Sequence, residues 1–332
     1  MSENVGINVT TVNNTSKQLL QINYYCAFAL GSVFNAVLIF LILRRSPTNL
    51  QSYRPILLIA AFTDCFSILI VGLCQKDVRQ FDRLSLAVFN GPAKYLPEIW
   101  QHVAYALLLI SFNLEALILL LETWFRYQFV KTRNVMPLKR LLCFVLVILI
   151  LCSIQVPIFV SDYVYYRNAD NEYRLLWRQE DLNAYVMIVH FKIHWVYHLN
   201  GMTRLLISTA ALLLSIFISF WSIHVMKKDV TNISKKTRDL LDQFTRTIVI
   251  RLIMFSTTSV LPVGIAIIAK YLVINWIKVN LIALLFFPWL PGFNSALSIY
   301  FIKPYRETLL ELNRRLFAFC SSTNETRVQS VS

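Results

Sequence analysis

Charged residues are scarce in this sequence. Only 15% of its 332 residues are Asp, Glu, Lys or Arg, whereas 57% are hydrophobic and the mean hydropathy is +0.56. Soluble domains have about 25% charged and about 45–50% apolar residues. The shortage of charge argues against an ordinary soluble domain and indicates that lipid surrounds much of the chain.

Signatures of catalysis and of metal binding are missing as well. The sequence has no GxGxxG, GxSxG, HExxH or P-loop motif, so we do not expect an enzyme. Its six cysteines are scattered singly, without a CxxC pair, which favours neither a zinc site nor a disulfide framework. We therefore expect no metal centre and no organic cofactor.

Long apolar stretches dominate the rest of the chain. A helix needs roughly 20 residues to cross a hydrocarbon core, and seven stretches approach or exceed that length. The alternating pattern of a β-barrel is absent, so helices are the remaining way to span the membrane. The sequence predicts an all-α membrane protein with seven spans, near 22–43, 55–74, 97–125, 140–161, 202–226, 246–269 and 279–302.

The distribution of charge predicts how the bundle is oriented. Segments 44–54, 126–140, 227–246 and 303–332 hold 19 of the 32 Lys and Arg residues but only 6 acidic ones. The positive-inside rule then places these segments in the cytoplasm and the N-terminus outside. An acidic inner leaflet accounts for the net charge of +14, so we expect no nucleic-acid partner. Residues 1–21 form the outer tail, where Asn8, Asn13 and Asn14 lie in glycosylation sequons.

The segment after the last span, residues 304–332, begins as a short amphipathic helix lying on the membrane. Pro304 can occupy the first helical position. Apolar side chains then share one face while most charges lie elsewhere. The apolar positions are Tyr305, Leu309, Leu312, Leu316 and Phe319. Cys320 follows directly and is either a palmitoylation site or an unmodified tail thiol.

Four polar residues on four different spans lie at similar depth. Asn35, Asp64, Glu115 and Asn294 are each roughly 12–17 Å from the inner end of their span, at about 1.5 Å per residue. Ionisable groups inside a membrane are costly and usually functional. Two carboxylates in one layer need a counter-ion or a proton. We expect Asp64 and Glu115 to share a sodium ion, or one of them to be protonated. The alternative is that one of the pair faces a separate hydrogen-bond partner.

The third span carries a stripe of polar residues. Ser111, Glu115, Glu122 and Arg126 lie within roughly 60° of one another around the helix, so the stripe must face the bundle. Glu122 can pair with Arg126 one turn away, or with Arg251 at similar depth in the sixth span. A carboxylate with two cationic partners is a candidate latch between two states of the bundle. The alternative is one static ion pair.

Prolines in the last two spans agree with a bundle that moves. Pro262 lies in the sixth span, and Pro288 and Pro291 lie in the seventh. Each removes a helix hydrogen bond and permits a kink.

Four motifs occur in order along the spans. They are NAVLIFLILRRSPTNLQSYRPILL, GPAKYLP before the third span, FRYQFV at its end and FNSALSIYFIKPYRE at the end of the seventh. Together they resemble the serpentine receptor class delta (Srd) family, nematode chemoreceptors of the seven-helix G-protein-coupled class, over most of residues 22–308. One departure is Ala93, which stands where the resemblance leads us to expect a cysteine.

This resemblance implies a chemosensory receptor in the plasma membrane of a sensory-neuron cilium, with a heterotrimeric G protein as the inner partner. It gives Arg126 and Tyr127 an inner-face switch role, and places Tyr300 and Tyr305 in the corresponding region of the last span. The usual disulfide between the third span and the second outer loop cannot form. Cys26 and Cys74 either pair with each other or remain thiols.

A ligand pocket is expected between the outer halves of the third, fifth, sixth and seventh spans. Its candidate lining by depth is Trp100, His102, Tyr105, Tyr271, Trp276 and Phe287. Such aromatic walls favour a small hydrophobic or volatile ligand over a peptide.

Three histidines precede the fifth span at His190, His194 and His198. On a helix they would stack on one side and form a metal site or a pH sensor. The alternative is an aromatic segment at headgroup level.

The leading interpretation is a receptor that shifts between two bundle states and thereby recruits a G protein. One alternative is a channel-type chemoreceptor with the N-terminus inside. Another is a small membrane transporter.

Overall fold

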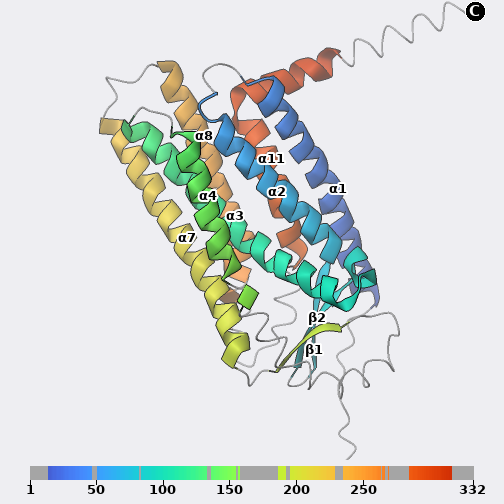
Figure 1. Cartoon of the computed structure of the whole chain (residues 1–332). Helices are drawn as coiled ribbons and strands as arrows, with labels where there is room; N and C mark the ends of the chain where they lie inside the picture. Colours follow the sequence, from blue (N-terminus) through green and yellow to red (C-terminus); the bar gives the residue numbers. More distant parts are fainter. Residues whose placement is uncertain are drawn as a thin grey trace, which may run out of the picture.

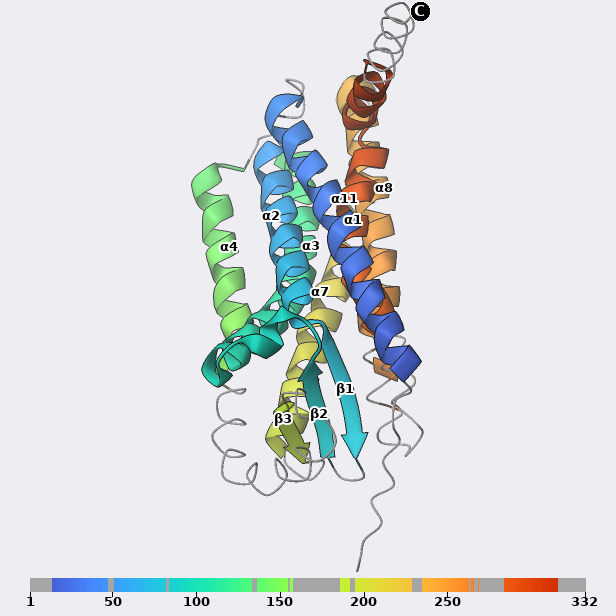
Figure 2. The same cartoon turned by 90° about the vertical axis from the view of Figure 1, so that its right-hand side faces the viewer.

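Long α-helices form most of the described part of the chain. The computed structural model describes residues 14–46, 51–81, 84–132, 136–154, 156–157, 186–191, 195–228, 235–262, 264–265, 268 and 284–315. Within these residues, seven α-helices belong to the bundle: α1 (Asn14–Arg44), α2 (Arg54–Cys74), α3 (Glu98–Thr132), α4 (Leu138–Ser153), α7 (Trp195–Lys228), α8 (Lys235–Phe255) and α11 (Leu290–Phe301). They lie roughly side by side, as Figures 1 and 2 show.

Helix α3 occupies the centre of this bundle. It packs against α2, α4, α7 and α8, whereas α1 packs against α2 and α11. Within the described residues, five helices are long and apolar enough to cross a membrane. They are Gln18–Arg44, Arg54–Cys74, Ile99–Thr132, Met202–Met226 and Leu284–Phe301. The expected helical bundle is confirmed.

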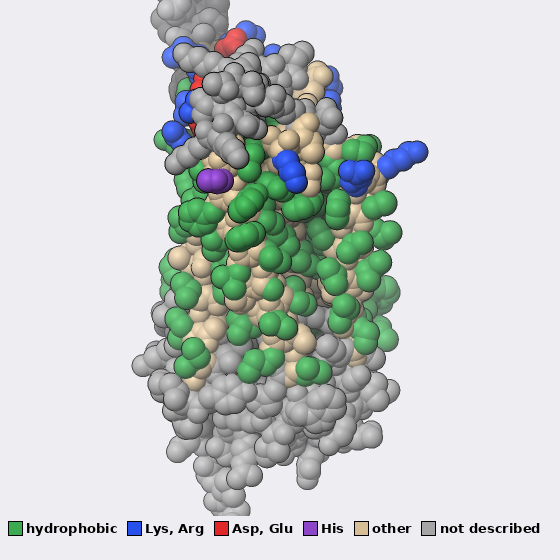
Figure 3. Space-filling model, turned by 90° about the vertical axis from the view of Figure 1, so that its left-hand side faces the viewer, with side chains coloured by type: hydrophobic (Ala, Val, Ile, Leu, Met, Phe, Trp, Pro, Cys, Tyr) green, Lys and Arg blue, Asp and Glu red, His purple; other side chains and the backbone are tan. Residues whose placement is uncertain are grey.

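The outer surface of the bundle is apolar, as a protein solvated by lipid requires. In Figure 3, hydrophobic side chains cover the middle of the face shown, and Lys and Arg gather near the end opposite the sheet. Exposed large side chains on α7 include Leu206, Leu213, Phe217 and Phe220. On α4 they include Leu142, Leu146 and Ile150. Water would not favour such a surface, whereas acyl chains do.

The helices that correspond to the sixth and seventh spans are interrupted where their prolines lie. After α8, residues Ser256–Val260 form a π-helix, two residues before Pro262. Before α11, a 3₁₀ turn, η5 (Phe287–Trp289), contains Pro288. Departures from α-helical hydrogen bonding at such places are common hinge points. The expected breaks in regular geometry are therefore present in both helices.

One end of the bundle carries a small antiparallel sheet that the sequence patterns did not predict. Strands β1 (Lys76–Phe81) and β2 (Leu84–Phe89) form a hairpin, and β2 also pairs with β3 (Val186–Phe191). This sheet end lies at the bottom of Figure 1. Because β2 leads towards α3 and β3 precedes α7, the pairing ties these two segments together by backbone hydrogen bonds.

The described cysteines are all thiols. They are Cys26, Cys65, Cys74, Cys143 and Cys152. Cys26 and Cys74 therefore do not pair. The β2–β3 ladder holds the segment before α3 where the resemblance would have led us to expect a disulfide.

The chain enters α3 through a tight turn that requires glycine. A Cβ atom added at Gly91 would lie 2.4 Å from the carbonyl oxygen of Leu73, far inside van der Waals contact. The short 3₁₀ helix η2 (Pro92–Tyr95) follows, and Gln101 of α3 donates to the carbonyl oxygens of Lys94 and Leu96. These contacts fix the start of α3 against the end of α2.

After α11 the chain turns and residues 303–315 form another helix, in agreement with the expected amphipathic segment. Tyr305 is fully buried, and its hydroxyl lies 3.0 Å from Ser46 Oγ at the end of α1. The charged side chains of Arg306, Glu307 and Glu311 are exposed. The helix is thus anchored to the bundle through Tyr305, while its charged face remains outside.

Candidate functional site

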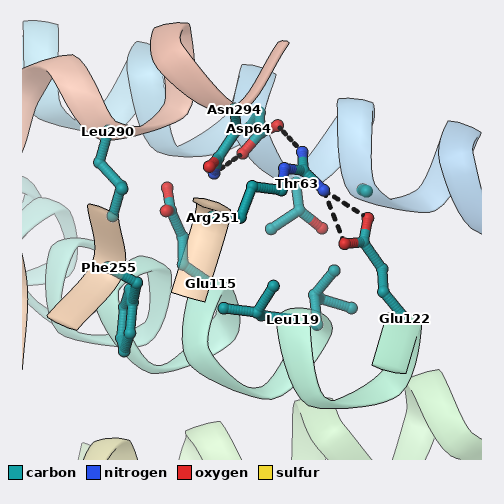
Figure 4. Close-up of a pocket in the computed structure, with 11 residues that line it drawn as sticks. Thr63, Asp64, Glu115, Leu119, Glu122, Arg251, Phe255, Leu290 and Asn294 are labelled. Carbon is teal, nitrogen blue, oxygen red and sulfur yellow. Dashed lines mark hydrogen bonds and ion pairs between the residues drawn. The ribbon is translucent and has the colours of Figure 1, made fainter. Parts of the chain in front are cut away.

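A network of buried polar groups joins four helices in the interior of the bundle. Arg251 of α8 donates from Nη1 to both carboxylate oxygens of Glu122 on α3, at 2.7 and 2.6 Å. Its Nη2 lies 3.4 Å from Asp64 Oδ2 on α2. Asn294 of α11 donates to the other oxygen of Asp64 at 3.0 Å. Figure 4 shows these side chains converging from their helices.

The charges of this network are removed from solvent. Asp64, Glu122 and Arg251 expose 3%, 7% and 5% of their surface. Buried ion pairs cost several kcal/mol of desolvation for each ion, and only good geometry with further hydrogen bonds repays it. Such an arrangement is therefore weak evidence for stability alone, and inside a membrane it indicates function.

Close packing of α1 against α11 holds the other side of the network. A Cβ on Gly292 would lie 3.0 Å from the Cα of Gly31, so the two backbones meet where neither residue has a side chain. One turn further, Ser295 donates to Asn35 Oδ1 at 2.6 Å, and Asn35 donates to the carbonyl oxygen of Gly31. The layer predicted from depth is thus brought together, with Ser295 as an additional member.

Glu115 differs from the other members of this layer. It exposes 7% of its surface, and among the described residues neither carboxylate oxygen has a hydrogen-bond partner. It lines a cavity of about 20 Å³ together with Asp64, Glu122 and Arg251. That volume exceeds the roughly 10–15 Å³ that one water molecule needs. Three carboxyl groups and one guanidinium face this small polar space.

Arg126 makes no ion pair with Glu122, although the two are one turn apart. Arg126 exposes only 1% of its surface; its Nη2 lies 3.7 Å from Met226 Sδ. Within the described residues its Nε and Nη1 have no partner. Of the two partners open to Glu122, the structure selects Arg251, whose Nη1 contacts both carboxylate oxygens from α8. The full stripe of Ser111, Glu115, Glu122 and Arg126 is buried, as the helical spacing predicted.

A second cavity of about 20 Å³ lies between the two arginines. Its lining includes Glu122, Arg126 and Arg251. Tyr53 lines it too and was not singled out from the sequence. The Tyr53 ring stacks on Phe244 of α8 with centroids 4.5 Å apart, and its hydroxyl has no partner among the described residues. Tyr53 belongs to the first of the four motifs, but no sequence pattern placed it at a cavity with Arg126 and Arg251.

The remaining predicted switch residues lie away from this network. Tyr127 is half-buried and packs on Trp124 with centroids 5.5 Å apart. Tyr300 is 60% exposed and contacts Phe301 edge-on. The guanidinium of Arg306 lies 5.8 Å from the Tyr300 ring centre. The structure therefore does not bring Tyr127 or Tyr300 into contact with Glu122 or Arg251.

The predicted ligand-lining residues fall into three groups. His102 and Tyr105 are buried on α3, and Phe287 stacks on Phe112 of α3 at 5.2 Å. Trp100 is 58% exposed. Tyr271 and Trp276 lie outside the described residues.

The predicted modification sites lie at the two ends of the chain. The glycosylation sites Asn8 and Asn13 and the lipidation site Cys320 lie outside the described residues. The third glycosylation site, Asn14, is the first residue of α1.

The three histidines before the fifth span do not share a helix. His190 lies in β3 and pairs with Ser85 of β2, whereas His198 lies in α7, which begins only at Trp195. His194 lies outside the described residues. The helical stack considered from the i, i+4, i+8 spacing is wrong, because the apolar, β-branched run before His190 pairs as a strand.

Comparison with known proteins identifies a similar fold and a family for this chain. The chain is similar to squid rhodopsin in a crystal structure, with a TM-score of 0.62, 11% sequence identity and coverage of 91% of this chain and 86% of that one. At this identity the likeness concerns the fold, a seven-helix bundle. No curated protein matches the sequence. A model of the serpentine type 7TM GPCR chemoreceptor Srd family matches residues 20–311, and the chain belongs to this family.

Proposed function

We propose that this chemoreceptor binds a small environmental molecule and signals through a heterotrimeric G protein. The observation that carries the proposal is the contact of Arg251 with Glu122 and Asp64, which links α8 to α3 and α2 inside the bundle. In a seven-helix receptor, a signal must pass between the two ends as a rearrangement of helices. A buried ion pair between two helices has discrete made and broken states, and so suits such a rearrangement.

Glu122 lines one small cavity together with two cationic side chains, Arg126 and Arg251. A second state of the bundle, in which Glu122 pairs with Arg126, is therefore within reach. In the described structure it accepts from Arg251, while Arg126 has no carboxylate partner among the described residues. A shift of α8 relative to α3 would exchange one arginine for the other. The π-helix at Ser256–Val260 lies one turn from Arg251 and offers the hinge for that shift. Through this shift, ligand binding near the sheet end would change the arrangement of helices at the opposite end, where the G protein binds.

The test is deorphanisation in cells. Calcium imaging of cells that express the full chain with a G protein, against a panel of odorants, should identify a ligand. Arg126→Ala should abolish the calcium response to that ligand, while ligand-induced thermal stabilisation of the purified receptor persists. A response that survives Arg126→Ala unchanged would contradict the proposed switch. Uptake of the ligand without any G-protein activation would favour a transporter instead.

We also propose that a sodium ion or a proton occupies the carboxylate layer. Asp64, Glu115 and Glu122 bring three potential negative charges to a space where Arg251 supplies one positive charge. Two carboxylates in one site rarely ionise without compensation. The thermal stability of the wild type should therefore rise with sodium concentration more than that of Asp64→Ala, if sodium is the compensating charge. Equal sodium sensitivity in the two proteins would end the proposal of a shared sodium ion.

We propose that the receptor lies in the plasma membrane of a sensory cilium with its N-terminus outside. The basic inner segments and the sequons at Asn8, Asn13 and Asn14 support this orientation. Enzymatic removal of N-linked glycans should increase the gel mobility of the wild type. The same treatment should leave the gel mobility of the variant with Asn8, Asn13 and Asn14 all changed to Gln unaltered. An unglycosylated N-terminus that is protected from external protease would indicate the inverted topology of channel-type chemoreceptors.

A further inference from the structure

Two cationic side chains lie over aromatic rings on one face of α3, towards the sheet end. The Nζ of Lys76, the first residue of β1, is 4.9 Å from the centre of the Tyr105 ring. The guanidinium carbon of Arg204 on α7 is 4.8 Å from the centre of the Phe112 ring. Tyr105 and Phe112 are seven residues apart, so they share a helix face at a separation of about 10 Å. Leu108 lies between them on the same face.

Lys76 has no carboxylate partner in the described part of the chain. Its amine donates to the Tyr105 hydroxyl at 3.2 Å. The neighbouring Asp77 is buried and has other interactions, and successive residues of a strand point to opposite faces. The Tyr24 hydroxyl of α1 donates to the backbone oxygen of Lys76 and so fixes the strand but not the amine.

The surroundings of this amine disfavour its charged form. Removal from water, and then the positive charge of Arg204, lower the pKa of Lys76 to about 7. A negative group beside the amine would reverse both effects, because an opposite charge within a few ångströms favours the ammonium form. Two cationic side chains over one face of α3, one of them without a carboxylate within the described residues, favour an anion beside Lys76.

We propose that the ligand of this receptor is a small organic acid, whose carboxylate binds Lys76 in the combined field of Lys76 and Arg204 while its apolar body packs along Tyr105, Leu108 and Phe112. This inference rests on the proposed function as a ligand-binding receptor and deepens it. Apolar walls alone would accept any hydrophobic molecule of fitting size. The cationic end makes the site select acids over esters, alcohols and amines of the same shape.

Matched series of acids, esters and alcohols test this selectivity. The purified full-length receptor would be heated with a series of straight-chain and aromatic carboxylates, with their methyl esters and with the corresponding alcohols. We expect at least one acid to raise the melting temperature, while its ester and alcohol have no effect. Stabilisation by acid and ester alike would overturn the proposal. So would a full series in which no acid stabilises.

Variants then locate the carboxylate. Lys76→Gln should weaken acid binding by about tenfold or more, as expected for loss of a charge-assisted hydrogen bond. Lys76→Arg should retain binding. Lys94→Gln is the matched control, because Lys94 also lies over a tyrosine ring, Tyr95, at 4.8 Å near the same end but outside the site. Wild-type affinity in Lys76→Gln would contradict the proposal. If that variant does not fold, the comparison of acid with ester in the native receptor decides.

Binding and signalling are separated by a parallel G-protein assay. Acids that stabilise the receptor without activating a G protein would support the acid site and overturn the proposed signalling. G-protein activation by esters and not by acids would support the signalling and overturn the acid site.

Discussion

Arg251 binds Glu122 through one nitrogen and approaches Asp64 through the other. The distances are 2.7 and 2.6 Å to the two oxygens of Glu122 and 3.4 Å to Asp64. One guanidinium thus connects helices α8, α3 and α2, which are far apart in the sequence. All three groups are buried, so bulk solvent does not replace a partner that is removed.

Removal of this guanidinium should be strongly destabilising. Arg251→Gln leaves two buried carboxylates without their cation, and breaking a buried pair typically costs about 3–5 kcal/mol. Glu122→Gln should cost a similar amount, because it leaves Arg251 with Asp64 alone. The double variant should lose less than the sum of the two, since only Asp64 then lacks the cation, whereas Arg251→Gln alone leaves two carboxylates without it. Equilibrium unfolding of the purified receptor measures all three.

An exposed pair on the helix after α11 serves as the control. Lys303 and Glu307 lie 3.7 Å apart and each exposes about 60% of its side chain. Exposed pairs contribute about 0–1 kcal/mol, so Glu307→Gln should change stability only slightly. Strictly additive losses in the double variant of Glu122 and Arg251 would show that the two residues do not act as a pair.

The bundle and its buried polar stripe could be predicted because both follow from local rules. Apolar length fixes the spans, and helical periodicity places Glu115, Glu122 and Arg126 on one side of α3. The cost of charge in lipid then requires that side to face inward. The partner of Glu122 does not follow from such rules. It depends on the rotation of α8 about its axis and on the side-chain conformation of Arg251.

The sheet and the position of His190 could not be predicted for a different reason. The segments before α3 and before α7 are separated by about a hundred residues, and their pairing is a non-local contact. A short apolar run such as Val186–Phe191 fits a strand or the start of a helix equally well. Tyr53 illustrates the same limit, because its place between the two arginines arises only when α2, α3 and α8 pack together.

Glu115 should respond to neutralisation in the opposite way to Glu122. Its oxygens have no partner among the described residues, and two further carboxylates line its cavity. Glu115→Gln keeps the shape of the side chain and removes a potential negative charge from this group. We expect stability to stay constant or to rise by up to about 1 kcal/mol, a shift of roughly 2–4 °C in melting temperature. A loss as large as that of Glu122→Gln would mean that Glu115 is held as a charged partner.

The turn at Gly91 should not tolerate a side chain. The nearest atoms to an added Cβ are the Leu73 carbonyl oxygen at 2.4 Å and Gln75 Cγ at 2.9 Å, and the first of these belongs to the backbone. Gly91→Ala should therefore displace the start of α3 from the end of α2, at a cost of about 1–3 kcal/mol. Gly264→Ala is the control, because nothing lies within 4 Å of its added Cβ. If both variants melt at the wild-type temperature, the turn is not tightly constrained.

Lys76 should make the stability of the sheet end depend on pH. Its folded-state pKa of about 7 lies below the ordinary lysine value of 10.5, because burial and then Arg204 disfavour the charged amine. Below pH 7 the amine is protonated in both the folded and the unfolded chain, so the full cost of the buried charge is present. Between about pH 7 and pH 10.5 the unfolded chain binds the extra proton, and stability rises with pH.

Lys76→Met removes this contribution while keeping an apolar side chain over Tyr105. The melting temperature of the wild type, measured relative to that of the variant, should rise as the pH is raised from about 6.5 to about 9. The other groups near this amine are Tyr24, Cys74, Asp77, Tyr105 and Arg204. They are the same in both proteins, so the difference between the two curves isolates the lysine. Parallel curves over this range would show that Lys76 keeps its proton in the folded chain, with an acidic partner already in place.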